Sequence, residues 1–393
     1  MRIPYRDPLP PPTIIPRSAT TLQSAVAALL QFLNTPPPNG LPDSTVVLSG
    51  AGLSVASGLA DYRGVNGTYR VNKSYRPIYH NEFIANHAFR QRYWARSFLG
   101  WSSLHKATPN AGHYAIRDLG QLGLVKHVIT QNVDSFHSTA HPHLPTVELH
   151  GYLRSTVCMT CREEFSRDDF QHELARLNPA WHAFLIEAVA SGALNTEVPH
   201  HSRAKGLRTN PDGDVDLADA PYTTFRYPPC PNCLAESPRL FRSQNLLIET
   251  DEDGAWKPGS TAGILKPAVI MFGESIPKRV KLVAEEAIDK AGRLLVLGTS
   301  LATGSAWMLA RRAKQRGMPM AVINIGGIRG EEFFFSEVDR QQPGNEGVRV
   351  ELATDELLPL LVDQLKQRSD LASSHEKCTL ELNNSAVFKD MLS

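Results

Sequence analysis

Short apolar runs with little polar alternation recur along the chain, and small or polar residues follow each of them. These runs cover residues 46–48, 126–130, 293–297 and 321–325, and residues 147–149 end a further predicted strand. Runs of this kind are typical of parallel strands that are covered on both faces. Apolar residues at helical spacing occupy residues 20–33, 280–291 and 306–316. Strands that alternate with helices predict an α/β fold with a doubly wound parallel sheet, which binds ligands at the carboxyl ends of its strands.

The middle of the chain has a different character. Residues 168–189 have the pattern of a single helix, whereas residues 191–229 are rich in Gly, Pro, Asp, Asn and His. Low apolar content over such a length predicts a long, partly disordered insertion within a small module. Further along, residues 251–254 predict the tip of a hairpin, and residues 369–393 predict a loose tail.

Composition and charge narrow the class of protein. The chain has 393 residues, of which 42% are hydrophobic and 21% charged, and its net charge is +1. These values fit one large or two modest globular domains. No apolar run reaches the length of about 18 residues that a membrane span needs. The balanced charge gives no electrostatic case for nucleic acid as a ligand.

The first residues of the chain allow two interpretations. Arg2, Arg6 and Arg17 stand against a single acid, which resembles a mitochondrial presequence. The proline run at residues 8–12 opposes the amphipathic helix of such a signal and equally favours a disordered, Pro-rich leader. A mitochondrial location is therefore expected, with the cytoplasm or the nucleus as alternatives.

Four of the five cysteines form two C-x-x-C pairs. Cys158 and Cys161 make the first pair, and Cys230 and Cys233 make the second. Two such pairs predict a closed, tetrahedral site with four thiolates, in which zinc has a structural role. The 68 residues between the pairs exceed the usual spacing, and four unconnected thiols are the alternative. Cys378 has no partner in this pattern and is expected to be a bystander.

The run at residues 46–48 leads into a turn of small residues. Gly50, Ala51 and Gly52 allow close approach of the backbone to a ligand, and Ser54 adds a hydroxyl group. A strand, a glycine turn and a helix N-terminus together commonly hold a phosphate. The third glycine falls late, at Gly58, so the turn is a poor match to the dinucleotide fingerprint of ordinary dehydrogenases. A carboxylate, an aromatic ring and a guanidinium follow: Asp61, Tyr62 and Arg63.

Polar residues also follow three other predicted strands. They are Gln131, Asn132 and Asp134 after residues 126–130, His150 after residues 147–149, and Gly298, Thr299 and Ser300 after residues 293–297. If the second strand continued, Asn132 and Asp134 would share one face and Gln131 the other. Taken alone, these residues fit polar turns and a structural histidine better than a catalytic site.

The order of these blocks resembles the sirtuins, the NAD-dependent protein-lysine deacylases. The family pattern GAG-x-S-x-x-SGIPD-F-R is matched by GAGLSVASGLADYR, which departs from it at Leu59, Ala60 and Tyr62. TQNVD, HG, both cysteine pairs and GTS follow in the family order, and residues 76–151 look most like the mitochondrial class II branch. The resemblance implies a Rossmann-like sheet with a small inserted zinc domain. It implies a transferase that moves an acyl group from lysine to ADP-ribose, releasing nicotinamide and 2′-O-acyl-ADP-ribose.

The resemblance also implies roles for individual residues. His150 would be the catalytic base, Asn132 and Asp134 would hold the nicotinamide carboxamide, and Gln131 its ribose. Arg63 would orient the cofactor, and Tyr62 would shield the reacting ribose. Further NAD contacts would come from the glycine turn and from residues near the carboxyl end of the chain: Gly298, Thr299, Ser300, Asn324, Ile325, Gly326 and Thr354. The segment VIMFGE would pair with the substrate peptide through Val269, Phe272 and Gly273.

A pair of residues in a predicted helix at residues 90–98 concerns the acyl group. Tyr93 and Arg96 share a face there, and relatives that prefer acidic acyl-lysines resemble this chain in having a Tyr-x-x-Arg pair. A guanidinium in the acyl pocket would grip a carboxylate. A surface helix with a packed tyrosine and a solvated arginine is the alternative, and Arg92 competes with Arg96 for the role.

The expected organisation has five parts. They are a leader (1–19), the first part of the NAD-binding domain (20–152), the zinc module (153–240), the second part of the NAD-binding domain (241–368) and a tail (369–393). A monomer is expected, with acyl-lysine proteins as substrates. ADP-ribosyl transfer from the same NAD site is the alternative reaction, and a non-catalytic NAD sensor is a third hypothesis. A zinc hydrolase does not fit, because four thiolates leave the metal no open position.

Overall fold

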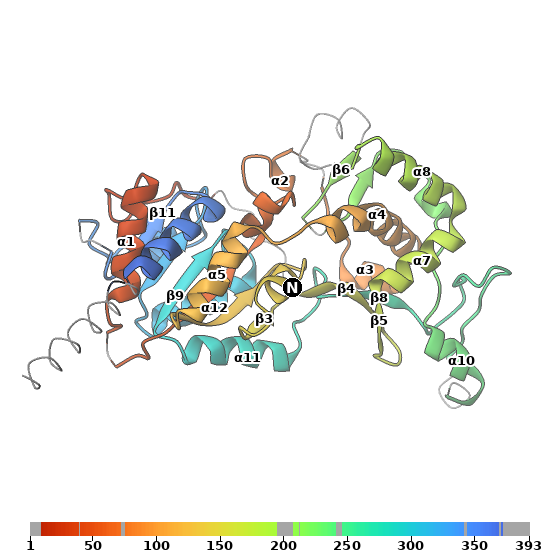
Figure 1. The fold of residues 1–393 in the computed structure, drawn as a ribbon. Coiled ribbons are helices and arrows are strands. Elements are labelled where there is room, and N and C mark those ends of the chain that lie inside the picture. The colour runs from red at the N-terminus through yellow and green to blue at the C-terminus, as the bar shows by residue number, and fades with distance from the viewer. Residues whose placement is uncertain are drawn as a thin grey trace, which may run out of the picture.

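The computed structural model describes residues 9–38, 40–71, 75–194, 207–211, 213–240, 246–341, 344–368 and 371. Its central feature is a six-stranded sheet in the order β11-β10-β9-β1-β2-β3, and every neighbouring pair is parallel (Figure 1). The strands are β1 (Thr45–Ser49), β2 (Val125–Thr130), β3 (Thr146–Glu148), β9 (Arg293–Leu297), β10 (Met320–Ile323) and β11 (Gly347–Val350).

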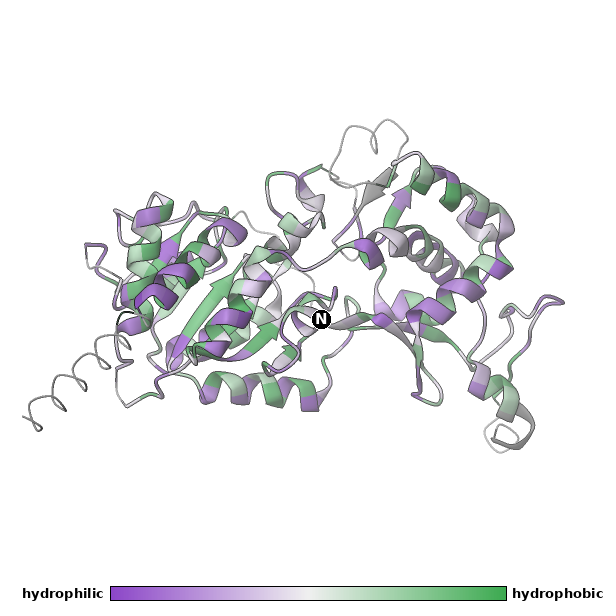
Figure 2. Cartoon of the chain, viewed as in Figure 1, coloured by the Kyte–Doolittle hydropathy of each residue, from purple (hydrophilic) through white to green (hydrophobic). Residues whose placement is uncertain are grey.

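Helices cover both faces of this sheet. One face packs on α1 (Leu22–Asn34), α5 (Ala111–Gln121) and a helix over 354–368. The other packs on α11 (Lys278–Asp289), α12 (Gly304–Gln315) and α13 (Glu331–Phe335). Alternate strand residues enter the two cores, as Val47 and Val46 do in β1. Burial on both faces explains the apolar strand sequences, which stand out as green arrows in Figure 2.

A second core lies beside the first. It is built around a three-stranded antiparallel sheet in the order β5-β4-β8. Its elements include β4 (Gly151–Cys158), β5 (Glu164–Ser166), β8 (Leu265–Val269), α3 (His80–Ala85), α4 (His87–Lys106), α7 (Arg167–Leu177), α8 (Pro179–Ala190) and α10 (Pro231–Leu240). The aromatic residues Phe83, Trp94, Phe98 and Phe170 are all buried in it. The core therefore combines α3 and α4 with elements that follow β3.

Short elements complete the described chain. They are the 3₁₀ helices η1 (Ala51–Ser57) and η2 (Tyr222–Thr224), the helices α2 (Thr68–Val71) and α6 (Phe136–Ala140), and the hairpin strands β6 (Leu207–Thr209) and β7 (Val215–Leu217). In the portions of the chain that the structure describes, no helix combines the length and the apolar character required to cross a bilayer.

Several predicted elements are confirmed, and some need correction. The predicted strand at 293–297 coincides with β9, and Asp251 N–H bonds to the Ala255 carbonyl at the predicted hairpin tip. The single helix predicted over 168–189 is wrong, because α7 ends before Asn178 and α8 restarts at Pro179. Proline has no N–H to donate to a continuing helix but is favoured in a first turn.

The insertion is more ordered than predicted in its described part. Its β6–β7 hairpin and η2 pack against α4. Part of the expected leader is ordered too, since Ile15 is fully buried and makes an antiparallel bridge with Arg349 of β11. Residues 1–8, which carry Arg2 and Arg6, lie outside the described residues, as do residues 195–206 and most of the tail with Cys378. The five-part domain division stays a prediction.

Candidate active site

A cleft of about 500 Å³ lies at the carboxyl ends of the parallel strands. Its walls come from the loops after β1, β2, β9 and β10, from the end of β8 and from α4. Of the site residues predicted above, those lining the cleft are Gly50, Ala51, Gly52, Ser54, Asp61, Tyr62, Arg63, Tyr93, Arg96, Gln131, Asn132, Asp134, His150, Val269, Phe272, Gly298, Thr299, Ser300, Asn324, Ile325 and Gly326. Gly273 and Thr354 are not part of the lining.

The glycine turn after β1 packs directly against the loop after β9. A Cβ on Gly52 would lie 2.8 Å from the Gly298 carbonyl oxygen, and one on Gly50 would lie 2.6 Å from Thr299 Cβ. Gly298 has φ +58°, and a Cβ there would lie 2.3 Å from the Leu53 nitrogen. Side chains are therefore excluded where the two loops meet. The N–H groups of the three glycines bond to the Leu297, Gly298 and Ile323 carbonyls, so the glycines join the two loops at the edge of the cleft.

His150 lies between β3 and β4 and is held from both sides of its ring. Its Nδ1 is 3.1 Å from the Gln131 carbonyl oxygen, and its Nε2 is 2.7 Å from Ser305 Oγ. A carbonyl oxygen only accepts, so Nδ1 carries the proton and Nε2 presents its lone pair. Burial lowers the pKa of His150 to about 4, although the Gln131 carbonyl opposes this shift. The ring is therefore a neutral base at physiological pH.

Ser305 and Thr303 belong to the site but were not predicted. Thr303 is the N-cap of α12 and donates to Gln131 Oε1 over 2.9 Å. Gln131 in turn donates to Thr299 Oγ1 over 2.9 Å. This network fixes the amide of Gln131 beside His150. The available sequence signal was only a Thr-Gly-Ser start of a helix, which by itself is an ordinary cap.

Asn132 and Asp134 meet at Ser54. Asn132 donates to the Gly50 carbonyl and to Ser54 Oγ, each over 3.1 Å, and Ser54 donates to Asp134 Oδ2 over 2.7 Å. Burial raises the pKa of Asp134 above its ordinary value, and the bond from the Phe136 N–H opposes this shift. The premise of a continuing strand is wrong, because β2 ends at Thr130 and Gln131 also faces the cleft.

The segment 61–64 closes one side of the cleft. The Gly64 N–H donates to Asp61 Oδ2 over 2.9 Å, and burial raises the pKa of this carboxyl. The ring of Tyr62 stacks on Tyr69 at 5.5 Å, and the Arg63 guanidinium lies 4.9 Å from the centre of the same ring. These contacts give Tyr62 and Arg63 defined positions in the cleft wall.

The loop after β10 forms another part of the cleft wall. Asn324 donates to the carbonyls of Ile325 and Gly326, and the Gly326 N–H donates to Glu351 Oε1 over 2.9 Å. A Cβ on Gly326 would meet no atom within 4 Å, so this backbone faces open space. Glu351 brings a carboxylate to this loop from the end of β11.

The last residues of β8 lie beside His150. The Ile270 N–H donates to the His150 carbonyl over 2.7 Å, and Phe272 bridges to Tyr79. β8 is an edge strand of its sheet, and Val269 and Phe272 face the cleft. An edge beside a cleft offers backbone groups for an added strand.

Tyr93 and Arg96 of α4 line the same cleft, but Arg96 is not solvated. Its side chain is 3% exposed and forms an ion pair with Asp214, with 2.9 Å between Nη2 and Oδ2. Burial alone would lower the pKa of Arg96, but Asp214 and Asp216 hold it above its ordinary value. The competing candidate Arg92 is 45% exposed and lies 3.7 Å from Asp216.

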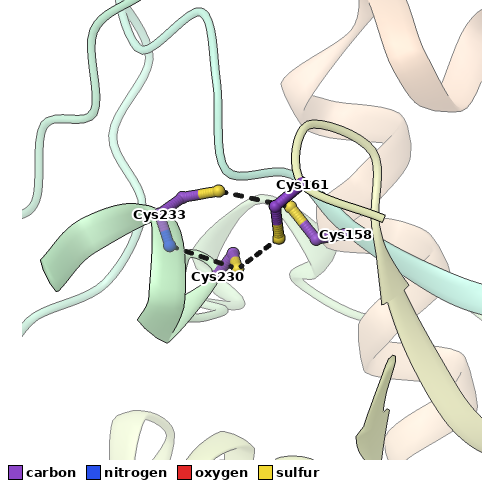
Figure 3. A group of neighbouring side chains, drawn as sticks. All are labelled: Cys158, Cys161, Cys230 and Cys233. Carbon is purple, nitrogen blue, oxygen red and sulfur yellow. Dashed lines mark hydrogen bonds between the residues drawn. The ribbon is translucent and has the colours of Figure 1, made fainter. Parts of the chain in front are cut away.

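The four paired cysteines converge outside the cleft (Figure 3). The Sγ atoms of Cys158, Cys161, Cys230 and Cys233 lie within 4.8 Å of one another. Cys158 to Cys233 and Cys161 to Cys230 are each 3.7 Å. Four sulfurs about 2.3 Å from a tetrahedral zinc ion would stand about 3.8 Å apart. The cluster therefore has the dimensions of a zinc site and not the sulfur separation of a disulfide, about 2 Å.

Comparisons with known proteins agree with this geometry. A sequence profile of the Sir2 family matches residues 50–305. The NAD-dependent protein deacylase SIR4 of Batrachochytrium dendrobatidis is 38% identical over 314 residues, covering 79% of this chain and 89% of that protein. The NAD-dependent protein deacylase SRT2 of Arabidopsis thaliana is 35% identical over 287 residues, covering 73% of this chain and 67% of that protein.

Solved structures show the same fold. One that addresses the mechanism and regulation of Sir2 enzymes matches with a TM-score of 0.54 at 21% identity, covering 88% of this chain and 99% of its own. Sir2Tm bound to a propionylated peptide matches with a TM-score of 0.50 at 18% identity, covering 86% and 96%. Sequence and fold lead to one assignment, and the chain belongs to the Sir2 family, the sirtuins.

Proposed function

We propose that this protein is an NAD-dependent protein deacylase. It would transfer the acyl group of an acyl-lysine to ADP-ribose, consuming water and yielding lysine, nicotinamide and 2′-O-acyl-ADP-ribose. The single observation that carries the proposal is the state of His150. Its ring is neutral, with the lone pair of Nε2 directed to Ser305, in a cleft that also contains Asn132 and Asp134.

The cleft fits NAD on two grounds. The loops that meet at Gly50, Gly52 and Gly298 carry no side chain at their contact, and they line the part of the cleft where a pyrophosphate would lie. Gly326 faces open space where an adenosine would lie. When bound, NAD supplies an electrophilic ribose carbon with nicotinamide as its leaving group. Asn132 and Asp134, fixed through Ser54, would bind the carboxamide.

His150 would act as the general base. The Gln131 carbonyl fixes the tautomer, so only Nε2 accepts a proton. Ser305 already donates to this nitrogen over 2.7 Å, which shows that a hydroxyl reaches it with good geometry. A hydroxyl at the same distance could pass its proton to Nε2, with the positive charge then shared with the Gln131 carbonyl.

Acyl-lysine peptides would bind by strand addition. Val269 and Phe272 place the end of an edge strand beside the His150 carbonyl. Recognition through main-chain hydrogen bonds supports binding of many peptide sequences. The contacts assigned above to Gly273 and Thr354 stay predictions, because neither residue lines the cleft.

The four cysteines would hold one zinc ion with a structural role. All four ligand positions would be thiolates, so no site for water or substrate would remain. The cluster ties the loop after β4 to the start of α10, two segments that are distant in sequence. The mitochondrial class II branch, the cellular location and the monomeric state stay predictions.

The proposal is tested by product analysis. Purified protein is incubated with NAD and an acetyl-lysine peptide, and nicotinamide release is followed while products are identified by mass spectrometry. Deacylation requires 2′-O-acyl-ADP-ribose in equal amount to nicotinamide. ADP-ribose attached to protein without acyl transfer would instead identify the ADP-ribosyltransferase reaction, and no release from folded protein would contradict both.

A further inference from the structure

The β6–β7 hairpin brings a carboxylate to the part of the cleft that is lined by Tyr93 and Arg96. Asp214 directly precedes β7 and forms the 2.9 Å ion pair with Arg96. Asp216 stands 3.7 Å from Nε of the same guanidinium. Arg96, Asp214 and Pro211 line the cleft together with Tyr93 and His150. The insertion between the cysteine pairs therefore contributes directly to the cleft wall.

The position of Asp214 is built into the hairpin. The Asn210 N–H donates to the Asp214 carbonyl over 2.9 Å, and Asn210 Nδ2 donates to Asp214 Oδ1 over 2.7 Å. Gly213 has φ +68° and lies so close to α4 that a Cβ on Gly100 would be 1.9 Å from its carbonyl oxygen. This contact locks the turn onto α4 one helical turn beyond Arg96. The packing of the turn and the bonds from Asn210 therefore determine where the Asp214 carboxylate lies.

Among the described residues, the charged side chains around Arg96 already form ion pairs with one another. Arg92 and Arg96 are paired with Asp214 and Asp216, two cations with two anions. Arg96 is 3% exposed, and its Nη2 and Nε lie 2.9 Å and 3.7 Å from the Asp214 and Asp216 carboxylates, as ion-pair contacts without hydrogen-bond geometry. A third carboxylate would have to displace Asp214 from its hairpin or join it at close range. Like charges in a poorly solvated site repel strongly, so both routes are unfavourable.

We infer that Asp214 determines the acyl specificity of this enzyme by occupying Arg96, so that neutral acyl-lysines are favoured over acyl-lysines that end in a carboxylate. The inference rests on the proposed deacylase function and adds the substrate class. It reverses the simple expectation from the Tyr-x-x-Arg pair, in which Arg96 grips an acidic acyl group. Arg96 lies in the cleft, but the carboxylate that pairs with it is Asp214 of the protein itself and not an acyl group of the substrate.

The test compares two isosteric acyl groups on one peptide: succinyl-lysine and its neutral amide, succinamoyl-lysine, with acetyl-lysine as the reference. The kcat/KM for nicotinamide release is measured for each. Wild-type protein should favour succinamoyl over succinyl by at least about tenfold, the scale of one charge-assisted hydrogen bond. Asp214→Asn should lower this ratio by about tenfold or more, since it frees Arg96 while keeping an acceptor for Asn210.

Two variants serve as controls. Asp216→Asn removes the more distant carboxylate and should change the ratio by less than about threefold. The double variant Asp214→Asn with Arg96→Met removes both buried charges and should restore the wild-type preference. Thermal unfolding establishes that each variant is folded. Should Asp214→Asn fail to fold, the ratio of kcat/KM for the succinamoyl and succinyl peptides in the wild-type protein and in the double variant still tests the inference.

Binding without turnover separates this inference from the proposed function. Affinities of the succinyl and succinamoyl peptides are measured by fluorescence anisotropy, and the same ratios are expected. A wild-type protein that prefers the succinyl peptide, or a folded Asp214→Asn protein with an unchanged ratio, would overturn the role of Asp214. If no peptide is turned over but the binding preference for the succinamoyl peptide is kept, the proposed deacylase function is refuted and the proposed role of Asp214 in specificity is retained.

Discussion

Ser305 Oγ lies 2.7 Å from His150 Nε2, the nitrogen that the proposed reaction needs as a base. Ser305 follows the N-cap of α12, and Thr303 at that cap also bonds to Gln131, whose carbonyl holds His150 Nδ1. The helix start and the TQN segment thus hold opposite sides of one imidazole. This arrangement defines the tautomer, while burial keeps the ring neutral.

The first prediction concerns the pH dependence of the reaction. Burial lowers the pKa of His150 to about 4, so the base stays unprotonated well below pH 6. An ordinary histidine would lose tenfold in activity for each pH unit below about 6.5. We expect kcat/KM for nicotinamide release to stay nearly level from pH 8 to about pH 5.5, with circular dichroism as a check on folding. An acidic limb centred near pH 6.5 would contradict the assigned state of His150.

The second prediction separates the base from the residue that positions it. His150→Ala should lower kcat by about 10²–10⁴-fold, the usual contribution of proton transfer, with NAD affinity largely kept. Ser305→Ala leaves the base in place and should reduce kcat much less, while altering the pH profile. Single-turnover rates and NAD titration measure both effects. Equal losses in the two variants would mean that Ser305 itself takes part in the proton transfer.

The parallel half of the fold could be predicted because its signals are local. The core residues of strands such as β9 are apolar, and glycine or polar turns follow the carboxyl ends of these strands. A residue that directly follows such a strand in the sequence can therefore be expected to line the cleft. Helix starts and ends follow capping rules, as Thr21 illustrates at α1. The break at Asn178 was missed because apolar periodicity continues across it, and Pro179 was given too little weight.

The contacts of the insertion could not be predicted. Asp214 stands in a polar stretch whose composition indicates a loop, and nothing local links it to Arg96 on α4. The link depends on the approach of Gly213 to Gly100, a packing contact between distant segments. Ser305 was missed for a related reason, since a serine after an N-cap is common and only the fold brings it to His150.

The third prediction concerns the cysteine cluster. Cys158→Ser should remove the zinc and unfold the second core or abolish soluble expression, because structural zinc contributes directly to folding. Cys378→Ser, at the fifth cysteine of the chain, is the matched control and should leave metal content unchanged. Metal analysis with thermal unfolding checks both. Active wild-type protein that contains no zinc would contradict the assignment.

The fourth prediction arises from a buried group of histidines behind the glycine turn. His137 Nε2 lies 2.8 Å from Ser49 Oγ, its Nδ1 lies 2.9 Å from His141, and its ring is 5.1 Å from that of His113. Burial lowers the pKa of His113 to about 3 and that of His137 well below its ordinary value. Both stay neutral in the folded protein, whereas the unfolded chain takes up their protons below about pH 6.5.

Stability should therefore be complete above about pH 6.5 and be lost as the pH falls from there towards 3. At pH 5 each such histidine costs about 2 kcal/mol of unfolding free energy relative to pH 8. His113→Phe should reduce the difference between pH 8 and pH 5 by about that amount in urea unfolding. His143→Asn, at an exposed position, should leave the difference unchanged. A pH difference that His113→Phe does not alter would exclude His113 as a source.

The last prediction tests whether the hairpin is held on α4 by the Gly100 contact. Gly100→Ala places a Cβ where the Gly213 carbonyl oxygen would be 1.9 Å away, so hairpin and helix must separate. Overpacking of this kind costs about 1–3 kcal/mol, and protease cleavage within residues 207–217 should increase. Gly120→Ala on α5 is the control, because its Cβ would meet only the movable end of Leu144 at 3.1 Å. If Gly100→Ala leaves both stability and cleavage as in Gly120→Ala, the hairpin is not anchored at this contact, and Asp214 must be positioned by Asn210 and the strand pairing alone.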